Sequence, residues 1–272
     1  MNTADRGRLT KDGIRIYDPS DSAGMYAAGA LAARILDDIA AHVFVGQTTG
    51  AIDKAIEEMV DAAGATSATI GYKGYKHASC ISINHVVCHG IPGDKRLKDG
   101  DIVNIDVTVI VDGWFGDTSR MYVAGKLPRK AERLIQVTHD ALMLGIEAVK
   151  PGNTFGDIGF AIQSFVESHR MSVVRDFCGH GLGRVFHAPP NVLHYGKPGN
   201  GAVLEPGMFF TIEPMVNLGR PETKTLADDW TAVTRDKSLS AQFEHSVGVT
   251  EDGVEIFTQS AAGTFHPTYG QS

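Results

Sequence analysis

The sequence has few cysteines. Among its 272 residues, the only ones of this type are Cys80, Cys88 and Cys178. Their number is odd and none of them forms a Cys-x-x-Cys motif, which argues against a disulfide framework. The sequence therefore predicts a protein of a reducing compartment, and we expect a cytoplasmic location.

The chain also lacks long apolar runs and an excess of basic residues. No stretch approaches the roughly 18 apolar residues that span a bilayer, and residues 1–17 contain no apolar core of a signal peptide. The 25 basic and 32 acidic residues give a formal charge of −7. This balance provides no electrostatic footprint for nucleic acid or anionic lipid. We therefore expect neither a membrane nor a sequence-specific nucleic acid as a partner.

The apolar residues that are present mark a regular series of elements. Helical spacing alternates with β-branched runs, which indicates an α+β protein. Helices are predicted over 23–43, 49–63, 130–149 and 155–170, and strands over 102–111, 208–216 and 243–249. Residues 1–20 and 261–272 are interpreted as terminal tails. Because residues 1–17 show little apolar periodicity, we expect their removal to leave the function nearly unchanged.

Two segments of the chain recur at almost the same offset. Val45-Gly46-Gln47-Thr48 recurs 106 residues later as Pro151-Gly152-Asn153-Thr154. Leu97-Lys98-Asp99-Gly100, which precedes Asp106, recurs 107 residues later as Leu204-Glu205-Pro206-Gly207, which precedes Glu213. We infer one domain over 21–260, built from two similar halves of about 21–125 and 126–258. In this arrangement Asp106 and Glu213 occupy matching places.

The first half contains a hairpin that brings two carboxylates together. Asp112-Gly113 is a two-residue hairpin signal, so Thr108 should face Asp117 and Asp106 should face Ser119. Asp106 and Asp117 then lie diagonally on one face, roughly 7–8 Å apart at the backbone. Converging carboxylates repel each other unless a cation lies between them. The alternative is an exposed polar face of the sheet.

The second half supplies further candidate ligands. Glu213 and Glu244 lie in apolar, strand-like runs, where a lone carboxylate is costly to desolvate. His180 lies among glycines that let the backbone bend and present the imidazole. One imidazole and four carboxylates suit two divalent ions with shared ligands better than a thiolate zinc site. Three other histidines lie near these residues: His85, His194 and His245. For each of them a structural hydrogen bond explains the position at least as well as a role in the site.

A series of motifs runs in order from about residue 20 to 258. They are Gly71-Tyr72-Lys73-Gly74-Tyr75, Cys80-Ile81-Ser82-Ile83-Asn84, Val86-Val87-Cys88-His89-Gly90-Ile91-Pro92, Asn104-Ile105-Asp106-Val107, Gly116-Asp117-Thr118-Ser119, Gly179-His180-Gly181 with Phe186-His187, Thr211-Ile212-Glu213-Pro214, and Gln242-Phe243-Glu244-His245. Together they resemble the type I methionine aminopeptidases. The resemblance implies the pita-bread fold of the α+β class, with two pseudo-symmetric halves, a curved, mostly antiparallel sheet and helices outside.

The resemblance also implies two divalent metal ions, which can be cobalt, manganese, iron or zinc. Asp106 would bind one ion through both oxygens, and Asp117 and Glu244 would bridge the two ions. His180 and Glu213 would complete the second ion. A water between the ions would become the nucleophile, because two cations lower its pKa.

Three residues are implied to act on the substrate. His89 and His187 would contact the scissile amide and the developing tetrahedral intermediate, and Glu213 would shuttle a proton. The methionine side chain would bind in an apolar pocket, for which the alternative is that these side chains are simply core. The implied pocket residues are Tyr72, Tyr75, Cys80, Phe186 and Trp230, with Thr69 at the rim where many relatives have cysteine.

The reaction that follows from the resemblance is removal of the initiator methionine from nascent proteins with a small second residue. We expect a monomer, and contact with the ribosome is left open. Two alternatives are a proline-specific dipeptidase or aminopeptidase of the same fold and a non-catalytic relative that binds ribosomes or RNA. The first usually carries a further N-terminal domain, and the second loses metal ligands, whereas all five candidates are present here.

Overall fold

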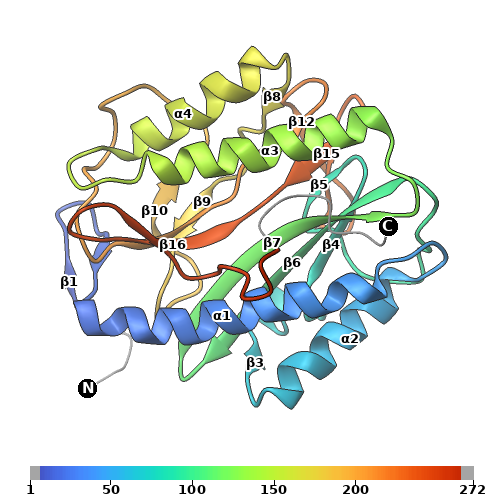
Figure 1. Cartoon of the computed structure of the whole chain (residues 1–272), viewed down its shortest axis with the longest axis horizontal. Coiled ribbons are helices and arrows are strands. Elements are labelled where there is room, and N and C mark those ends of the chain that lie inside the picture. Colours follow the sequence, from blue (N-terminus) through green and yellow to red (C-terminus); the bar gives the residue numbers. More distant parts are fainter. Residues whose placement is uncertain (1–6, 265–272) are drawn as a thin grey trace.

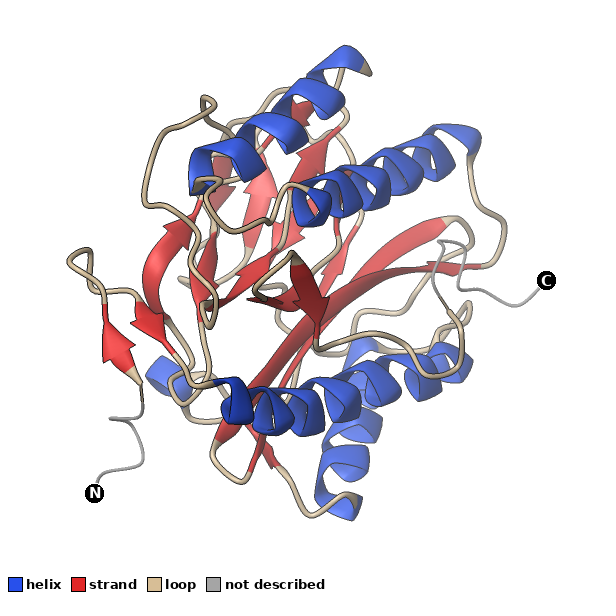
Figure 2. Ribbon diagram, turned by 60° about the vertical axis from the view of Figure 1, so that its left-hand side comes forward, coloured by secondary structure: helices blue, strands red, loops and turns tan. Residues whose placement is uncertain are grey.

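The computed structural model describes residues 7–264; residues 1–6 and 265–272, and with them most of the C-terminal tail interpreted from the sequence, lie outside the described part. Two pairs of helices cover the outside and strands lie between them (Figures 1 and 2). The α-helices are α1 (Ser22–Asp38), α2 (Thr49–Ala62), α3 (Arg129–Glu147) and α4 (Phe155–Ser168). Short 3₁₀ turns are η2 (Pro19–Asp21), η3 (Ile39–His42) and η4 (Tyr72–Gly74).

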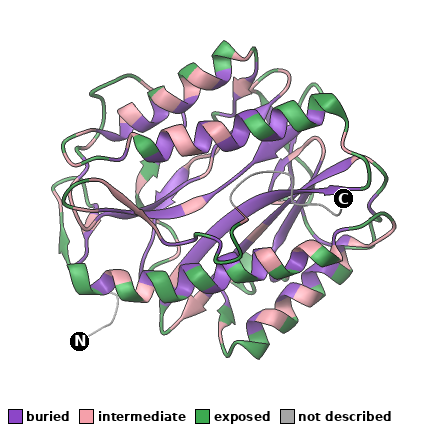
Figure 3. Ribbon diagram, in the orientation of Figure 1, coloured by how far each residue is buried: buried purple, intermediate pink, exposed green. Residues whose placement is uncertain are grey.

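The strands pair antiparallel throughout the described ladders. The first half contains β1 (Arg8–Leu9), β2 (Arg15–Ile16), β3 (Thr66–Ser67), β4 (Cys80–Ile83), β5 (Val86–Cys88), β6 (Asp101–Val111) and β7 (Trp114–Ala124). The second half contains β8 (Ser172–Val173), β9 (Gly179–Gly181), β10 (Ala188–Val192), β11 (Phe209–Ile212), β12 (Met215–Asn217), β13 (Thr223–Thr225), β14 (Ala232–Thr234), β15 (Ser240–Gln242), β16 (His245–Val249) and β17 (Val254–Ile256). Figure 3 shows that the central strands are mostly buried and that the helices expose one side. The fold is therefore α+β, as the sequence predicts.

The internal repeat is visible at the start of two matching helices. Gly46 and Gly152 both have positive φ, 93° and 89°, a conformation that glycine adopts without steric cost. Two residues later a threonine caps each helix: the Thr48 hydroxyl accepts from the Ala51 amide at 3.2 Å, and Thr154 forms a capping box with Asp157. The same local sequence thus starts α2 and α4.

The long hairpin β6–β7 has the register that the sequence predicts. Asp112 and Gly113 form the turn with φ of 49° and 77°, as a type I′ turn requires. Thr108 pairs with Asp117 and Asp106 pairs with Ser119. The diagonal placement of the two aspartates is therefore confirmed.

The second half differs from the prediction because its long strands are interrupted. The pairs Ile212–His245 in β11–β16 and Met215–Gln242 in β12–β15 belong to one continuous register. Between them the ladder opens at Glu213-Pro214 and Phe243-Glu244. Pro214 has no amide hydrogen for a ladder, and the Glu244 amide donates instead to the Ser119 carbonyl oxygen of β7 at 3.1 Å. This crossing connects the two halves of the molecule.

The interpretation of residues 1–20 as a tail is wrong for residues 8–17. Strands β1 and β2 form a hairpin, and Ile14, Ile16 and Tyr17 are buried. The Tyr17 amide donates to the Gly207 carbonyl oxygen at 2.8 Å, and its ring stacks on Phe209 at 4.8 Å between centroids. The rings that pack on Tyr17, Trp114 and Phe209, are about 100 and almost 200 residues away in sequence, so no local pattern could indicate this burial. No described helix is long and apolar enough to span a bilayer.

We expect Tyr17→Ala to destabilise the protein strongly, because it removes a buried aromatic ring from a packed cluster. Large aromatic-to-alanine changes in a core cost about 3–5 kcal/mol, and denaturant unfolding measures this change. Arg8→Ala is the control from the same hairpin: its ion pair with Glu205 is exposed, so the loss should stay below about 1 kcal/mol. Equally small effects of both substitutions would mean that the hairpin contributes little to stability.

Candidate metal centre

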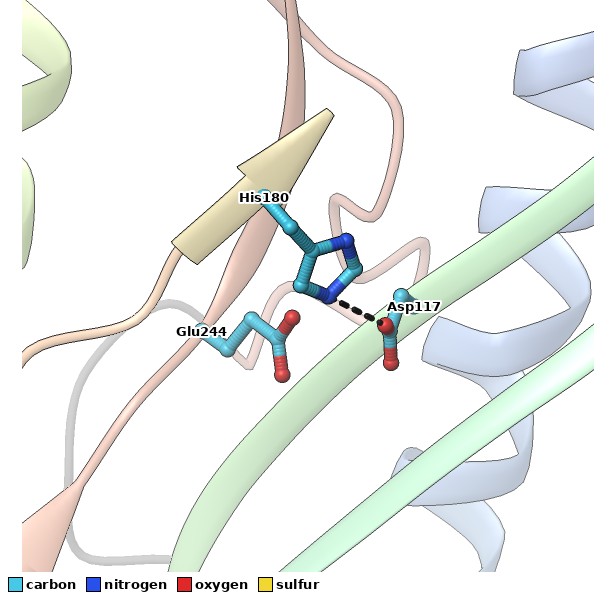
Figure 4. A group of neighbouring side chains, drawn as sticks. All are labelled: Asp117, His180 and Glu244. Atoms are coloured by element: carbon cyan, nitrogen blue, oxygen red, sulfur yellow. Dashed lines mark ion pairs between the residues drawn. The ribbon is translucent and has the colours of Figure 1, made fainter. Parts of the chain in front are cut away.

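All the site residues predicted from the sequence lie around one cavity of about 760 Å³. The candidate metal ligands in its wall are Asp106, Asp117, His180, Glu213 and Glu244. The candidate substrate-binding residues in its wall are Thr69, Tyr72, Tyr75, Cys80, His89, Phe186, His187 and Trp230. Figure 4 shows Asp117 of β7, His180 of β9 and Glu244, from the break between β15 and β16, pointing toward one another.

The local structure explains how each ligand reaches the cavity. Asp106 and Asp117 come from the continuous hairpin β6–β7, whereas Glu213 and Glu244 lie at the two facing strand breaks. His180 is the middle residue of β9. A Cβ on either of its glycine neighbours would collide with a backbone carbonyl oxygen of an adjacent segment, so only glycine lets β9 pack this closely.

The ligand atoms are spaced as a cation site requires. One ligand atom each of Asp117, His180 and Glu244 lies within 4.8 Å of the others. His180 Nε2 is 3.5 Å from Asp117 Oδ2 and 3.7 Å from Glu213 Oε1. Metal–nitrogen and metal–oxygen bonds of about 2.0–2.2 Å can bridge separations of this size. The donor set therefore fits a divalent cation.

Hydroxyl groups hold two of the carboxylates in place. Thr108 Oγ1 donates to Asp117 Oδ1 and Thr211 Oγ1 donates to Glu213 Oε1, each at 2.7 Å. Gln242 Nε2 also approaches Glu213 Oε2 at 3.3 Å. Second contacts of this kind orient metal ligands and limit their rotation. Thr108 and Gln242 were not selected from the sequence, although the hairpin register placed Thr108 opposite Asp117.

The electrostatics of the cavity favour added positive charge. Burial raises the pKa of Asp106 and Glu244 well above the ordinary range, and the negative charge of Asp117 adds to the effect. Burial raises the pKa of Glu213 to about 7, although His180 opposes the shift. Burial alone lowers the pKa of His180, but Asp117 and Glu213 raise it overall. One imidazole cannot balance four clustered carboxylates, whereas divalent cations can.

The two histidines that were predicted to act on the substrate, His89 and His187, are neutral imidazoles near pH 7. Burial lowers the pKa of His187 to about 4, and the neighbouring His180 acts in the same direction. Burial also lowers the pKa of His89. The His187 ring lies 4.1 Å from that of His180 and 5.1 Å from that of Tyr72. A neutral imidazole can donate one hydrogen bond to a group in the cavity.

The four aromatic residues predicted for the pocket lie in the cavity wall as two pairs of rings. The Tyr75 and Trp230 rings are 4.8 Å apart, and those of Tyr72 and Phe186 are 4.9 Å apart. The Tyr75 hydroxyl donates to the Ser79 carbonyl oxygen at 2.9 Å. This arrangement satisfies the polar end of Tyr75 and leaves a largely apolar surface for a ligand.

Several cavity residues were missed by the sequence reasoning. Lys73 belongs to the motif that begins at Gly71 but was not selected as a site residue, and its ammonium group lies 5.3 Å from the centre of the Tyr72 ring. Asp12 reaches the cavity from the β1–β2 hairpin, and nothing in its sequence context indicates this. The others that were not selected as site residues are Cys88, Asp176, Phe177, Cys178, Ala188, Pro189, Pro190, Asn191 and Met215.

Comparison with known proteins identifies the family of the chain. A sequence model of metallopeptidase family M24 matches residues 23–251. The chain is 56% identical over 257 residues to a methionine aminopeptidase of Rickettsia prowazekii, covering 94% of this chain and 99% of that protein. It is 53% identical to that of Escherichia coli K12, covering 90% of this chain and 94% of that protein.

Solved structures give the same result. The crystal structure of the Rickettsia prowazekii enzyme matches with a TM-score of 0.90 and 57% identity, covering 90% of this chain and all of that chain. The Thermotoga maritima methionine aminopeptidase matches with a TM-score of 0.88 and 40% identity, over 90% of this chain and 99% of that chain. A prolidase of Pyrococcus horikoshii, at 20% identity and a TM-score of 0.71, shares the fold.

The chain therefore belongs to metallopeptidase family M24, a class of metal-dependent hydrolases. Within that family it belongs with the methionine aminopeptidases of type I. The fold and the resemblance that the sequence motifs indicate are confirmed.

We expect Asp106→Asn and Glu244→Gln each to lower metal content and abolish turnover, because a neutral amide cannot replace a carboxylate between divalent ions. In the metal-free protein the same substitutions should raise the melting temperature, since each removes a buried negative charge. The raised pKa of both groups means that this gain is largest at alkaline pH and fades as the wild-type carboxylates become protonated.

Elemental analysis and thermal unfolding with and without metal measure these effects. Glu167→Gln is a matched control, because Glu167 is an exposed carboxylate on α4, and it should change neither quantity. Full metal content and activity in Asp106→Asn or Glu244→Gln would remove that residue from the site.

Proposed function

We propose that the chain removes the N-terminal methionine from peptides and nascent proteins whose second residue is small, with two divalent ions held by five residues. The proposed ligands are Asp106, Asp117, His180, Glu213 and Glu244. The observation that carries this proposal is the convergence of four carboxylates and one imidazole beside an aromatic-lined cavity. When bound, the ions supply positive charge that polarises the scissile carbonyl group and lowers the pKa of water. Cobalt, manganese, iron and zinc all suit this donor set, and availability selects among them.

The neutral histidines provide hydrogen bonds to the substrate. His187 and His89 donate hydrogen bonds from ring nitrogens to the scissile amide, whose carbonyl oxygen becomes an oxyanion in the tetrahedral intermediate. Both remain neutral near pH 7 because burial lowers the pKa of each ring. Glu213, held by Thr211, would accept a proton from the attacking water and pass it to the leaving amine.

The aromatic residues of the cavity wall provide the methionine pocket. Tyr72, Tyr75, Phe186 and Trp230 offer ring faces, with Cys80 and Thr69 at the same cavity. Burial of a methionine side chain contributes about 1.5–3 kcal/mol, enough to favour it over a polar residue. The buried free thiols of Cys80 and Cys88 agree with action in the cytoplasm.

We expect a peptide series to show selection on the second residue. Methionine should be released rapidly from peptides with Gly, Ala or Ser after it, and slowly or not at all from those with Leu, Phe or Lys. Release of methionine is measured by chromatography at a fixed metal concentration. A peptide of the form Xaa-Pro is the control for proline-specific activity and should not be cleaved. Equal rates for Met-Ala and Met-Leu peptides would contradict the proposed preference.

Substitution of the two histidines should separate catalysis from metal binding. His187→Ala and His89→Ala each remove a hydrogen-bond donor, and loss of one such donor slows turnover by about 100- to 1,000-fold. Both variants should keep their full metal content and their fold. Steady-state kinetics combined with elemental analysis measure the two effects. A metal-depleted histidine variant would assign that residue to the metal shell instead.

A further inference from the structure

The strand breaks that present Glu213 and Glu244 leave two backbone amides without a ladder partner. The register of β11–β16 and β12–β15 would pair these two glutamates directly if the strands were continuous. The Glu244 amide finds its acceptor in the other half, at the Ser119 carbonyl oxygen. The Glu213 amide must find another acceptor, because a buried amide without one costs about 1–3 kcal/mol.

That acceptor is the imidazole of His194. The Glu213 amide donates to His194 Nε2 at 3.0 Å. His194 lies two residues after the end of β10 and is fully buried, with 0% of its surface exposed. It does not line the cavity that contains the candidate ligands. Its contact is therefore with the backbone of Glu213 and leaves the carboxylate free to face His180.

The protonation of His194 follows from this geometry. Nε2 accepts the Glu213 amide hydrogen, so this nitrogen carries no proton of its own and the ring is a neutral imidazole. Since Nε2 accepts a hydrogen bond, the single proton must lie on Nδ1. Among residues 7–264 no side chain or backbone group hydrogen-bonds Nδ1. Among the described residues, the hydrogen bond from the Glu213 amide is therefore the contact that determines the tautomer of His194.

We propose that His194 is a positioning residue of the metal centre, whose neutral ring replaces the missing strand partner of Glu213 and keeps this glutamate turned into the cavity. Without the acceptor, the Glu213 amide would have to turn toward another partner, and its carboxylate would turn with it. The inference rests on the proposed role of Glu213 as a metal ligand. Loss of a residue that orients a ligand typically lowers metal affinity or activity about 10- to 100-fold.

Two substitutions distinguish the hydrogen bond from simple packing. His194→Leu fills similar space without an acceptor, whereas the side-chain oxygen of His194→Gln can replace Nε2. Metal affinity is measured by calorimetric titration of the metal-free protein with Mn²⁺, alongside kcat and KM for a Met-Ala peptide. We expect His194→Leu to bind one Mn²⁺ about 10- to 100-fold more weakly and to lose kcat with little change in KM. His194→Gln should stay within a few-fold of wild type.

Control variants separate this inference from the proposed function. Tyr122→Phe removes another buried side-chain-to-backbone hydrogen bond, from the Tyr122 hydroxyl to the Leu36 carbonyl oxygen, and should leave Mn²⁺ affinity unchanged. Glu213→Gln tests the ligand itself. If Glu213→Gln binds two Mn²⁺ normally, the proposed ligand role fails; if it loses one ion while His194→Leu binds both normally, only the positioning role fails. Equal damage in His194→Gln and His194→Leu would also overturn the positioning role.

Nitrogen-15 spectra of the wild-type metal-free protein provide a test that needs no variant to fold. At pH 7 the His194 ring should carry its proton on Nδ1, and its Nε2 should be the unprotonated, hydrogen-bonded nitrogen. A ring protonated on Nε2 could not accept from the Glu213 amide and would overturn the proposal.

Discussion

The structure is organised around the repulsion of four carboxylates that meet in one partly closed cavity. Desolvation and mutual repulsion raise the pKa of Asp106, Glu213 and Glu244, so the cluster is unfavourable unless cations balance it. The two halves are joined at this same place. Ser119 accepts from the Glu244 amide, and the Asn104 amide group donates to the Gln242 carbonyl oxygen at 2.9 Å. These backbone hydrogen bonds hold the two halves together at the place where the carboxylates repel each other.

The backbone presents the carboxylates in a different way in each half. In the first half an unbroken hairpin places Asp106 and Asp117 by its register alone. In the second half the strands open, and Glu213 and Glu244 project from the openings. Each opening frees a backbone amide, and each amide is then bound by an acceptor outside its own ladder. The internal repeat therefore preserves the order of elements, whereas the backbone around the four carboxylates is asymmetric.

Much of this arrangement could be predicted from the sequence because it depends on short-range rules. The Asp112-Gly113 turn determines the pairing of Asp106 and Asp117, and the apolar spacing gave the four long helices to within a few residues. What could not be predicted depends on distant contacts. The burial of Tyr17 requires Phe209 and Gly207, and the break at Glu213 interrupts a run that has the composition of a continuous strand. The structural hydrogen bonds considered for His194 and His245 are present, but their partners, 13 or more residues away in sequence, could not be inferred from the pattern.

His180 and His187 in the cavity wall and His194 outside it differ in their ring protonation because their environments differ. His180 faces two carboxylates, which raise the pKa of its ring against the effect of burial. Its Nε2 lies 3.5 Å from Asp117 Oδ2 and 3.7 Å from Glu213 Oε1. His187 lies beside it, but burial and the charge of His180 lower its pKa to about 4, and the ring stays neutral as a donor. His194 is more deeply buried than His180, and its Nε2 accepts a hydrogen bond from the backbone amide of Glu213. One residue type thus meets three different environments, because the neighbouring charges and the depth of burial differ among the three positions.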